Sequence, residues 1–563
     1  MKNKIWKWLI VFAVIVITVS CKKKYDFDNI KPQEVYEAEW GAPLFQFTST
    51  LADYHQQYLD TIKPSTGTAE VIVDNNNLFH FIYRNRTDLG TAESNYSFPS
   101  PINFNLDFTS IPDSKWPVGL TEGIVSPGFN GFKSEKFTDT LYFDMQSSFG
   151  ADLLEAKFKG GSLDLAISSE YQHIISVEYN ILSFKKNGVI PNNTGTIPAS
   201  SSWTTSIDMT GMVVDFNTPK GINKIMVEVI SEFKLIGGNS IAKTDKINAN
   251  ATATNLKWEY VKGNVGNFPM TTVKSDTIDL DVFGDLKELE DNLVIYEPSL
   301  SMIFENTAGV AVEGVATKIS IIKRNGSQVA LNLNDNQIIV AADATNDLFD
   351  LSTPTTSEYL VDNINSNNLV DALKGQTVGI FYDLQLTGSG SVTGSQAWMR
   401  DTSRLMLNSV LDIPFALSVK EYTFSDTVKC MLCVDDTIKG EVEFELKLIV
   451  ENGLPLDVLV QGYFVDTINH NIIIDSLFSG DLALIDAAPI DATGKVISPK
   501  IYTRFITLSQ EQYEMARKLD FIYVAKGVTA KGGETEARFH ASDIFNIRAG
   551  GKVKIKVNPE DYE

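Results

Sequence analysis

The sequence predicts a mainly β protein with a minor helical part, organised as tandem antiparallel β-sandwich-like modules with short helices. Two observations carry this prediction: apolar residues alternate along many short segments, and one sequence pattern begins three times along the chain. The chain has 563 residues, of which 43% are hydrophobic and 10% aromatic. Such a chain can bury real cores, and at about 100–200 residues per domain it should contain several domains.

The alternation is clearest in three segments, "SLDLAIS", "SLSMIFEN" and "VEFELKLIVEN". Because successive side chains of a strand point to opposite faces, this period of two predicts strands with one buried face. The residues that we expect in the cores are Leu163, Leu165, Ile167, Leu300, Met302, Phe304, Val442, Phe444, Leu446 and Leu448.

Three corresponding stretches open with an Asp-Thr pair: "DTLYFDMQ" from Asp139, "DTIDLDVF" from Asp276 and "DTVKCMLC" from Asp426. Their starts lie 276 − 139 = 137 and 426 − 276 = 150 residues apart, which exceeds a solenoid repeat and suits a whole small domain. We therefore predict β-rich repeats over residues 136–272, 273–422 and 423–563.

Within each copy, strands flank Asn- or Gly-containing turns, as in "ENTAGVAVEG" and "VENGLPLDVL". This arrangement resembles the LEA-2 or WHy type of β-sandwich domain, and the resemblance implies antiparallel sandwich modules but no activity. Ser509 and Gln512 form a capping-box pattern, which predicts a helix in the third copy. Residues 36–135 show a different pattern, with a hairpin expected in "AEVIVDNNNLFHFIYRN", and we predict an N-terminal β-domain there.

The N-terminus has the three parts of an export signal. Residues 1–20 combine the basic start "MKNKIWK" with an apolar run from Trp8 to Ser20, and Cys21 follows. That run of 13 residues is shorter than the roughly 20 needed to span a bilayer as a helix, so we predict a signal peptide.

The segment "TVSC" that ends at Cys21 resembles the lipobox of bacterial lipoproteins. The resemblance implies that Cys21 is lipidated and becomes the new N-terminus, with a palmitate-type chain among its acyl groups. Two or more acyl chains give stable membrane anchoring. The polar segment 21–35 then forms a tether, and its charges resemble the surface-export signal of Bacteroidota lipoproteins. This resemblance implies an outer-membrane protein, at the cell surface rather than on the periplasmic face.

The tripeptide Asp-Ser/Thr-large apolar occurs seven times. It resembles the O-glycosylation signal of exported Bacteroidota proteins, although Asp-Thr-Ile is also an ordinary way for a turn to enter a strand. Both interpretations remain open. The hydroxyl residues concerned are Thr61, Thr140, Thr277, Thr427, Thr437, Thr467 and Ser476.

No catalytic pattern stands out in the sequence, and it indicates no cofactor and no metal site. The pair Cys430 and Cys433 lacks the helical setting of a redox motif, and the repeat places Cys430 at an apolar strand position; core packing, a disulfide and redox or metal chemistry stay open. The five histidines do not pair at metal-ligand spacing. The net charge of −23 disfavours nucleic-acid binding.

Tryptophan either fills cores or stacks on sugar rings. Trp40 and Trp258 are expected in cores, whereas Trp203 and Trp398 lie beside polar loops and are candidate ligand contacts. The function that we predict is a non-catalytic outer-membrane lipoprotein, acting as a binding or scaffold subunit of an assembly, export or uptake complex whose other components are its partners. The alternatives are a surface glycan-binding lipoprotein of a nutrient-uptake system and a secreted glycoside hydrolase.

Overall fold

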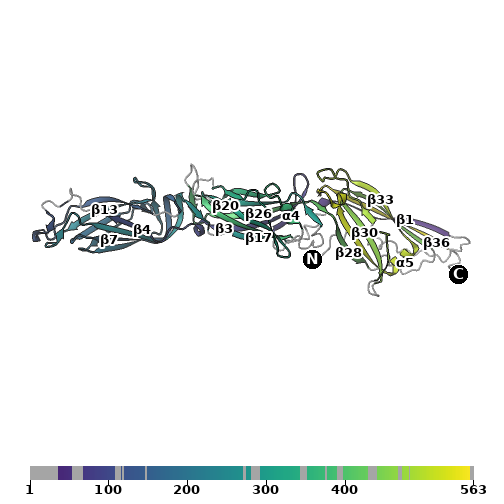
Figure 1. The fold of residues 1–563 in the computed structure, drawn as a ribbon, viewed down its shortest axis with the longest axis horizontal. Coiled ribbons are helices and arrows are strands. Elements are labelled where there is room, and N and C mark those ends of the chain that lie inside the picture. The colour runs from purple at the N-terminus through teal and green to yellow at the C-terminus, as the bar shows by residue number, and fades with distance from the viewer. Residues whose placement is uncertain are drawn as a thin grey trace.

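The computed structural model confirms a mainly β protein with few short helices. Three β-sandwich modules follow one another along an elongated molecule (Figure 1). The structure describes residues 36–53, 68–107, 116, 120–145, 149–270, 274–280, 292–342, 351–374, 377–389, 397–428, 441–466, 472–480 and 482–557.

Module 1 lies at the left of Figure 1 and is built mainly from residues 96–266. Its elements are α3 (Ala92–Asn95), β4 (Ile102–Asp107), β5 (Gly123–Ile124), η3 (Pro127–Phe129), β6 (Phe137–Asp144), β7 (Asp152–Ser169), β8 (Ile174–Asn180), β9 (Phe184–Lys186), β10 (Asn192–Ile197), β11 (Ser202–Asp208), β12 (Met212–Asp215), β13 (Lys224–Lys234), β14 (Ser240–Ile241), β15 (Ile247–Asn264) and β25 (Trp398–Arg400). The sheet β10-β8-β13-β6 packs on the sheet β25-β15-β7-β12-β9, to which β4 and β11 add, and one hydrophobic cluster fills the space between them.

Module 2 occupies the middle of the molecule (Figure 1). Its elements are β2 (Thr68–Val73), β3 (Phe79–Thr91), β16 (Asn267–Pro269), β17 (Lys274–Asp279), β19 (Ser299–Asn306), β20 (Ala311–Lys323), β21 (Gln328–Ala330), β22 (Gln337–Val340), β23 (Thr355–Val361), α4 (Leu369–Leu373), β24 (Thr377–Ser389) and β26 (Arg404–Pro414). The sheet β2-β3-β26-β19-β23 packs on the sheet of β16, β17, β24, β20, β21 and β22, with a second core between them.

Module 3 lies at the right of Figure 1. Its elements are β1 (Tyr36–Thr50), β28 (Tyr422–Val428), β29 (Glu441–Asn452), β30 (Leu456–Asp466), β31 (Ile472–Ser476), β32 (Leu482–Ile485), β33 (Lys500–Leu508), α5 (Gln510–Lys518), β34 (Asp520–Thr529), η5 (Ala530–Gly533) and β36 (Ile544–Val557). The sheet β1-β36-β29-β33 packs on the sheet of β28, β34, β30, β31 and β32. A small sheet of β18 (Leu293–Ile295), β27 (Ala416–Val419) and β35 (Ala537–Arg538) joins modules 2 and 3.

The three modules share one scheme of strand pairing. In each, the strand that contains the Asp-Thr pair lies beside a later strand: β6 pairs with β13, β17 with β24, and β28 with β34. That later strand also pairs with a third strand, which is β8 for β13, β20 for β24 and β30 for β34. In the opposite sheet, the last long strand of each copy pairs with an earlier strand of the same copy: β15 with β7, β26 with β19, and β36 with β29. The three sequence copies therefore fold with the same topology.

The described strands of residues 36–135 do not form a separate N-terminal β-domain, which contradicts that prediction. They are distributed over all three modules, where each completes a sheet: β1 pairs with β36, β3 with β26, and β4 with β15. Without β1 and β3, the strands β36 and β26 would end their sheets, and without β4 the first half of β15 would have a free edge. The early strands cover these edges. The expected hairpin in this region is present as β2 and β3, antiparallel across a turn.

The chain is therefore nested. From Tyr36 onward it runs from module 3 through module 2 to module 1, and then returns through modules 2 and 3. In β1, Tyr36 pairs with Val557, while Thr50 at the other end pairs with Ile544 beside module 2. The first and last described residues thus lie together at the free end of module 3, and module 1 forms the opposite end of the molecule (Figure 1).

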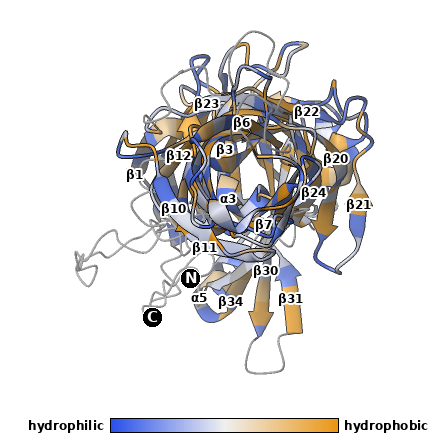
Figure 2. Cartoon of the chain, turned by 90° about the vertical axis from the view of Figure 1, so that its left-hand side faces the viewer, coloured by the Kyte–Doolittle hydropathy of each residue, from blue (hydrophilic) through white to orange (hydrophobic). Residues whose placement is uncertain are grey.

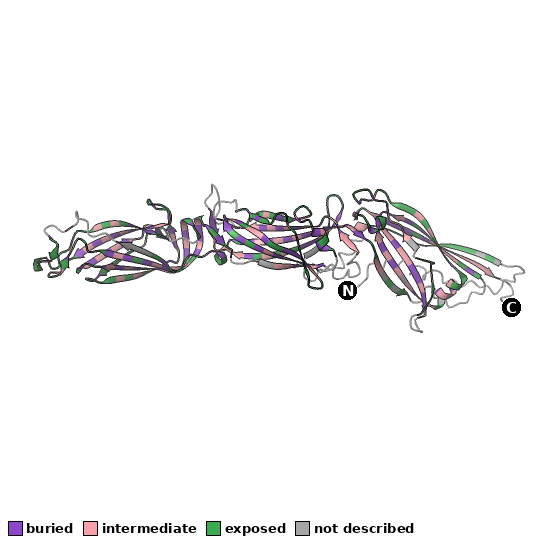
Figure 3. Ribbon diagram, in the orientation of Figure 1, coloured by how far each residue is buried: buried purple, intermediate pink, exposed green. Residues whose placement is uncertain are grey.

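Burial follows the alternation that the sequence shows, and buried and accessible residues alternate along most strands in Figure 3. The expected core residues of β7 and β19 are all buried, whereas Phe444 of β29 is only partly covered. The capping box of α5 is also confirmed: the Gln512 N–H donates to Ser509 Oγ at 3.1 Å, and the Ser509 N–H donates to Gln512 Oε1 at 3.2 Å.

Candidate functional surfaces

Several residues singled out from the sequence lie outside the described part of the chain. They are Cys21, Thr61, Thr437 and Thr467, together with the pair Cys430 and Cys433. The positions that the repeat equates with Cys430 are described in the other two modules. Phe143 in module 1 and Leu280 in module 2 both lie in hydrophobic cores.

The four described hydroxyl residues of the Asp-Ser/Thr motif all lie on strands at a sheet edge. Thr140 is on β6, Thr277 on β17, Thr427 on β28 and Ser476 on β31. Thr140 and Thr427 are exposed, whereas Ser476 is partly buried and its hydroxyl donates to the Phe478 carbonyl at 2.9 Å. An enzyme that modifies hydroxyl groups would therefore reach Thr140 and Thr427 most directly.

The aspartates of this motif have a local structural role. The carboxylates of Asp139, Asp276 and Asp475 each accept the N–H of the next residue at 2.8 Å. Asp276 also accepts the Thr87 hydroxyl at 2.9 Å. The recurrence of Asp-Thr thus has a structural explanation in addition to any role in modification.

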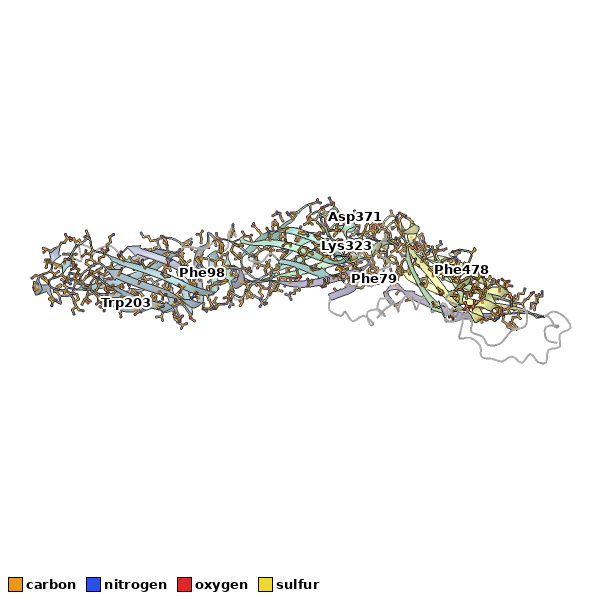
Figure 4. The ribbon with its side chains drawn as sticks, turned by 60° about the horizontal axis from the view of Figure 1, so that its bottom comes forward. Phe79, Phe98, Trp203, Lys323, Asp371 and Phe478 are labelled. Carbon is orange, nitrogen blue, oxygen red and sulfur yellow. The ribbon has the colours of Figure 1, made fainter. Side chains whose placement is uncertain are left out.

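Trp203 of β11 lies in module 1 (Figure 4) and packs against the hydrophobic core of that module. Its ring covers Gly195 of β10 so closely that a Cβ there would lie 2.3 Å from the ring, and its centroid is 5.9 Å from that of Tyr179. Trp203 is partly buried, so only part of one ring face could meet a ligand.

Trp398 is only 5% exposed, and its position argues against the ligand contact expected from the sequence. β25 pairs with β15 of module 1, which turns the ring inward against Gly309 and Tyr260. The expectation for Trp40 is also wrong, since 48% of it is exposed at the edge strand β1. Trp258 lies in a core as expected, and its indole N–H donates to the Tyr96 carbonyl at 3.1 Å.

The joint between modules 1 and 2 contains the buried ring of Trp398 and a cluster of charged residues. The Lys159 ammonium lies 2.6 Å from an Asp401 oxygen and 2.9 Å from a Glu93 oxygen. Burial alone would lower the pKa of Lys159, but the bonds to the two carboxylates raise it. Lys159 belongs to β7, whereas Glu93 and Asp401 lie on segments that connect the modules, so these ion pairs hold the joint together.

The joint between modules 2 and 3 contains two histidines and several carboxylates. His80 Nδ1 lies 2.7 Å from Asp412 Oδ1, and the Ala541 N–H donates to the Asn77 carbonyl at 2.7 Å. Burial raises the pKa of Asp543 to about 6, even though its carboxylate accepts the His540 N–H at 2.8 Å. Burial lowers the pKa of His540. Protonation in this joint therefore changes over mildly acidic pH.

His173 and Asp457 are two further buried or half-buried titratable residues. Within the described ranges, no cluster of three or more His, Cys, Asp or Glu side chains could hold a metal ion. His173 of module 1 is buried and accepts the Ile236 N–H at 3.1 Å, which is a structural role. Burial raises the pKa of Asp457 in module 3, whose carboxylate accepts the Ala487 N–H at 2.6 Å.

The free end of module 1, which faces the viewer in Figure 2, presents a platform of loops. We call it the distal surface and define it as residues 122–133, 169–173, 198–201 and 235–246. Ile124 is 79% exposed on it and Phe132 is 47% exposed. Backbone bonds between Val125 and the segment 238–239, both 2.8 Å, tie the loops together. The distal surface is therefore an ordered platform with exposed apolar side chains, which is typical of an interaction site.

The sequence analysis did not identify Ile124 or Phe132 as functional candidates. The available signal was the stretch "VSPGFNGF", in which aromatic residues lie among turn-forming Pro and Gly. Of the two aromatic residues in this segment, Phe132 is exposed, whereas Phe129 packs against the core of module 1.

Among the described residues, no helix has the length and apolar character needed to cross a membrane. No family model matches the chain, and no curated protein matches it.

Comparison with solved structures gives only distant likenesses. One is a protein from Parabacteroides distasonis inferred to be secreted, at 11% identity and a TM-score of 0.20, covering 67% of this chain and 99% of that one. Another is from infectious bursal disease virus, Gx strain, at 10% identity and a TM-score of 0.13, covering 88% of this chain and 82% of that one. A third is a peptide-N(4)-(N-acetyl-β-D-glucosaminyl) asparagine amidase, at 9% identity and a TM-score of 0.15, covering 56% of this chain and 96% of that one. At these TM-scores none of them indicates a function for this chain.

Proposed function

We propose that the protein is a non-catalytic, lipid-anchored rod of the outer membrane, which holds the distal surface of module 1 away from the membrane as a binding or scaffold site. The observation that carries this proposal is the nested chain path. Because Tyr36 lies at the free end of module 3, a lipid on Cys21 would attach the molecule by that end and leave module 1 at the far end.

The dimensions suit this role. The longest strands of module 1, module 2 and module 3 have 18, 13 and 15 residues, and at about 3.3 Å per residue three such modules in line give a rod on the order of 150 Å. From Cys21 to Tyr36 is 36 − 21 = 15 residues, which reach at most about 50 Å. Module 3 would therefore stay near the membrane.

The joints support a scaffold role because they fix each module relative to the next along the rod. The ion pairs of Lys159 and the buried ring of Trp398 fix the first joint. A shared three-stranded sheet spans the second. A partner bound at the distal surface would thus be held at a defined height rather than on a flexible chain.

Membrane attachment can be tested with Cys21→Ala, using Cys433→Ala as the matched control. We expect Cys21→Ala to move the protein from the outer-membrane fraction to the soluble fraction. Cys433→Ala should leave the protein in the outer-membrane fraction. An unchanged distribution of Cys21→Ala would exclude the lipid anchor. Protease treatment of intact cells should cleave the protein if it faces the cell exterior, and resistance until the outer membrane is opened would place it on the periplasmic face.

Binding at the distal surface can be tested by co-purification from mildly solubilised outer membranes. Ile124→Asp and Phe132→Asp each place a charge on the platform, whereas Ile339→Asp makes the same kind of change at an exposed position of module 2. We expect partner proteins to be lost with the first two variants and retained with the third. If partner proteins co-purified with all three variants, the distal surface would be excluded as the binding site.

A further inference from the structure

The outer face of the module 3 sheet β1-β36-β29-β33 is open to solvent among the described residues and carries an apolar patch. Ile501 and Phe505 of β33 are 69% and 55% exposed, and Ile449 of β29 lies diagonally between them because it pairs with Thr503. Three large apolar side chains that adjoin one another on an exposed sheet face commonly mark an interaction surface.

Beside the patch, charges of opposite sign alternate across three strands. Lys552, Lys554 and Lys556 of β36 lie between glutamates of β1 and glutamates of β29. The nitrogen–oxygen distances are 2.8 Å for Lys552 with Glu39, 3.9 Å for Lys554 with Glu37 and 3.8 Å for Lys556 with Glu441. The β29 glutamates on this face are Glu441, Glu443 and Glu445. A row of positive charge therefore runs directly beside a row of negative charge along the rod.

The relief of this face is also divided into two halves. At one level of the sheet, Pro43 of β1 and Gly550 of β36 carry little or no side chain, whereas Lys447 of β29 and Phe505 of β33 project from it. The Lys447 ammonium lies 5.7 Å from the centre of the Phe505 ring, so the two side chains form one raised feature. At this level along the strands, a flat half of the face therefore lies beside a raised half.

We infer that this face binds a second copy of the same chain, through a two-fold axis that runs parallel to the strands between β36 and β29. Such an axis keeps each residue at its own height and exchanges the two halves of the face. Phe505 of one copy then covers Pro43 of the other, and Lys447 covers Gly550. Lys552 meets Glu445 of the other copy. An axis along β36 would instead set lysine over lysine, and one along β29 glutamate over glutamate.

The available area suits a stable dimer. Four strands at about 4.8 Å spacing are about 19 Å wide, and the 14 residues of β36 span about 46 Å. The face therefore measures on the order of 900 Å², close to the roughly 800 Å² per partner of a standard interface. Sheets also pack face to face with aligned strands at about 10 Å in ordinary sandwiches.

This two-fold leaves both rods pointing the same way, so two copies could stand on one membrane. The dimer does not depend on the lipid anchor, because all the contacts lie within module 3. A failure of the anchor and a failure of the dimer are therefore separate results.

The test measures the mass of the full-length chain in mild detergent by sedimentation, with the detergent density-matched. At about 10 µM we expect a dimer, and Phe505→Asp should weaken it by about 100-fold because a carboxylate would lie buried against Pro43 of the other copy. Phe132→Asp is the matched control on the distal surface and should remain dimeric. A monomeric wild-type chain would overturn the inference, as would a dimer that survives Phe505→Asp or one that Phe132→Asp also abolishes.

Cross-linking gives a second measurement that does not disturb the patch. With Cys430 and Cys433 replaced by Ala, Gly550→Cys should link two chains through a short bismaleimide, since a Cβ fits at Gly550 with its nearest neighbour at 3.6 Å. Gly480→Cys, in the connection between β31 and β32 of the opposite sheet, is the control and should not link. Equal cross-linking of the two variants would also overturn the inference.

Discussion

Removal of the Trp398 side chain should loosen the joint between modules 1 and 2. The ring is 5% exposed and packs on Gly309, where a Cβ would lie 2.4 Å from it. A buried tryptophan contributes about 150–250 Å² of contact area, worth about 4–6 kcal/mol at 25 cal/mol per Å². Measured substitutions of buried aromatic residues by Ala cost about 3–5 kcal/mol. We therefore expect Trp398→Ala to lower the free energy of unfolding by about 4 kcal/mol.

Differential scanning calorimetry of the chain without its lipid provides the assay. For a module of this size, about 2–4 °C per kcal/mol implies that the transition containing module 1 falls by about 8–16 °C. Val261→Ala, a change in the core of module 1, identifies that transition. Gly309→Ala should cost about 1–3 kcal/mol because the methyl group meets the ring. In the Trp398→Ala background this cost should disappear.

Two results would refute this reasoning about the joint. One is a fall of less than about 1 kcal/mol for Trp398→Ala, which would mean that the ring is not buried as described. The other is an equal cost of Gly309→Ala with and without the ring, since the two residues would then not be in contact.

Three further predictions concern pH, shape and modification. Burial raises the pKa of Asp543 from 3.8 to about 6. Its ionised form therefore destabilises the fold above that pH, and this penalty vanishes as the pH falls towards 4. Urea unfolding should show that Asp543→Asn stabilises the protein at pH 8 by about 1–2 kcal/mol, after allowance for partial exposure, and has little effect at pH 4. Small-angle scattering should give a radius of gyration of about 45 Å, as expected for a rod of about 150 Å, and a value near the roughly 24 Å of a compact chain of this length would contradict the rod. If the exposed Thr140 is glycosylated, Thr140→Val should lower the mass of the exported protein by one glycan, whereas a wild-type mass that matches the polypeptide alone would exclude the modification.

Local patterns predicted the interior of the modules well. Alternation identified the buried faces of β7 and β19, since a strand with one buried face must alternate whatever its partner is. The Asp-Thr starts located the corresponding strands β6, β17 and β28. The capping box identified α5, because its bonds join residues only three apart.

The nested path could not be predicted, because it depends on pairing between distant segments. Tyr36 pairs with Val557 at the opposite end of the sequence, and no local pattern identifies such a partner. The wrong predictions for Trp40 and Trp398 have the same cause. Trp40 lies on an edge strand that leaves it accessible, and Trp398 is buried because β25 pairs with β15 of another module. The distal surface was missed for the same reason, as its loops come together only through the fold.

The central claim, an anchored rod with the distal surface far from the membrane, can be measured by energy transfer from a dye on the protein to acceptor lipids in vesicles. The lipid-bearing chain, with Cys430 and Cys433 replaced by Ala, would carry the dye either at Ser201→Cys on the distal surface or at Glu511→Cys on α5. We expect strong transfer from α5 and almost none from Ser201, which should stand on the order of 100 Å or more above the bilayer. Equal transfer from the two positions would contradict the account.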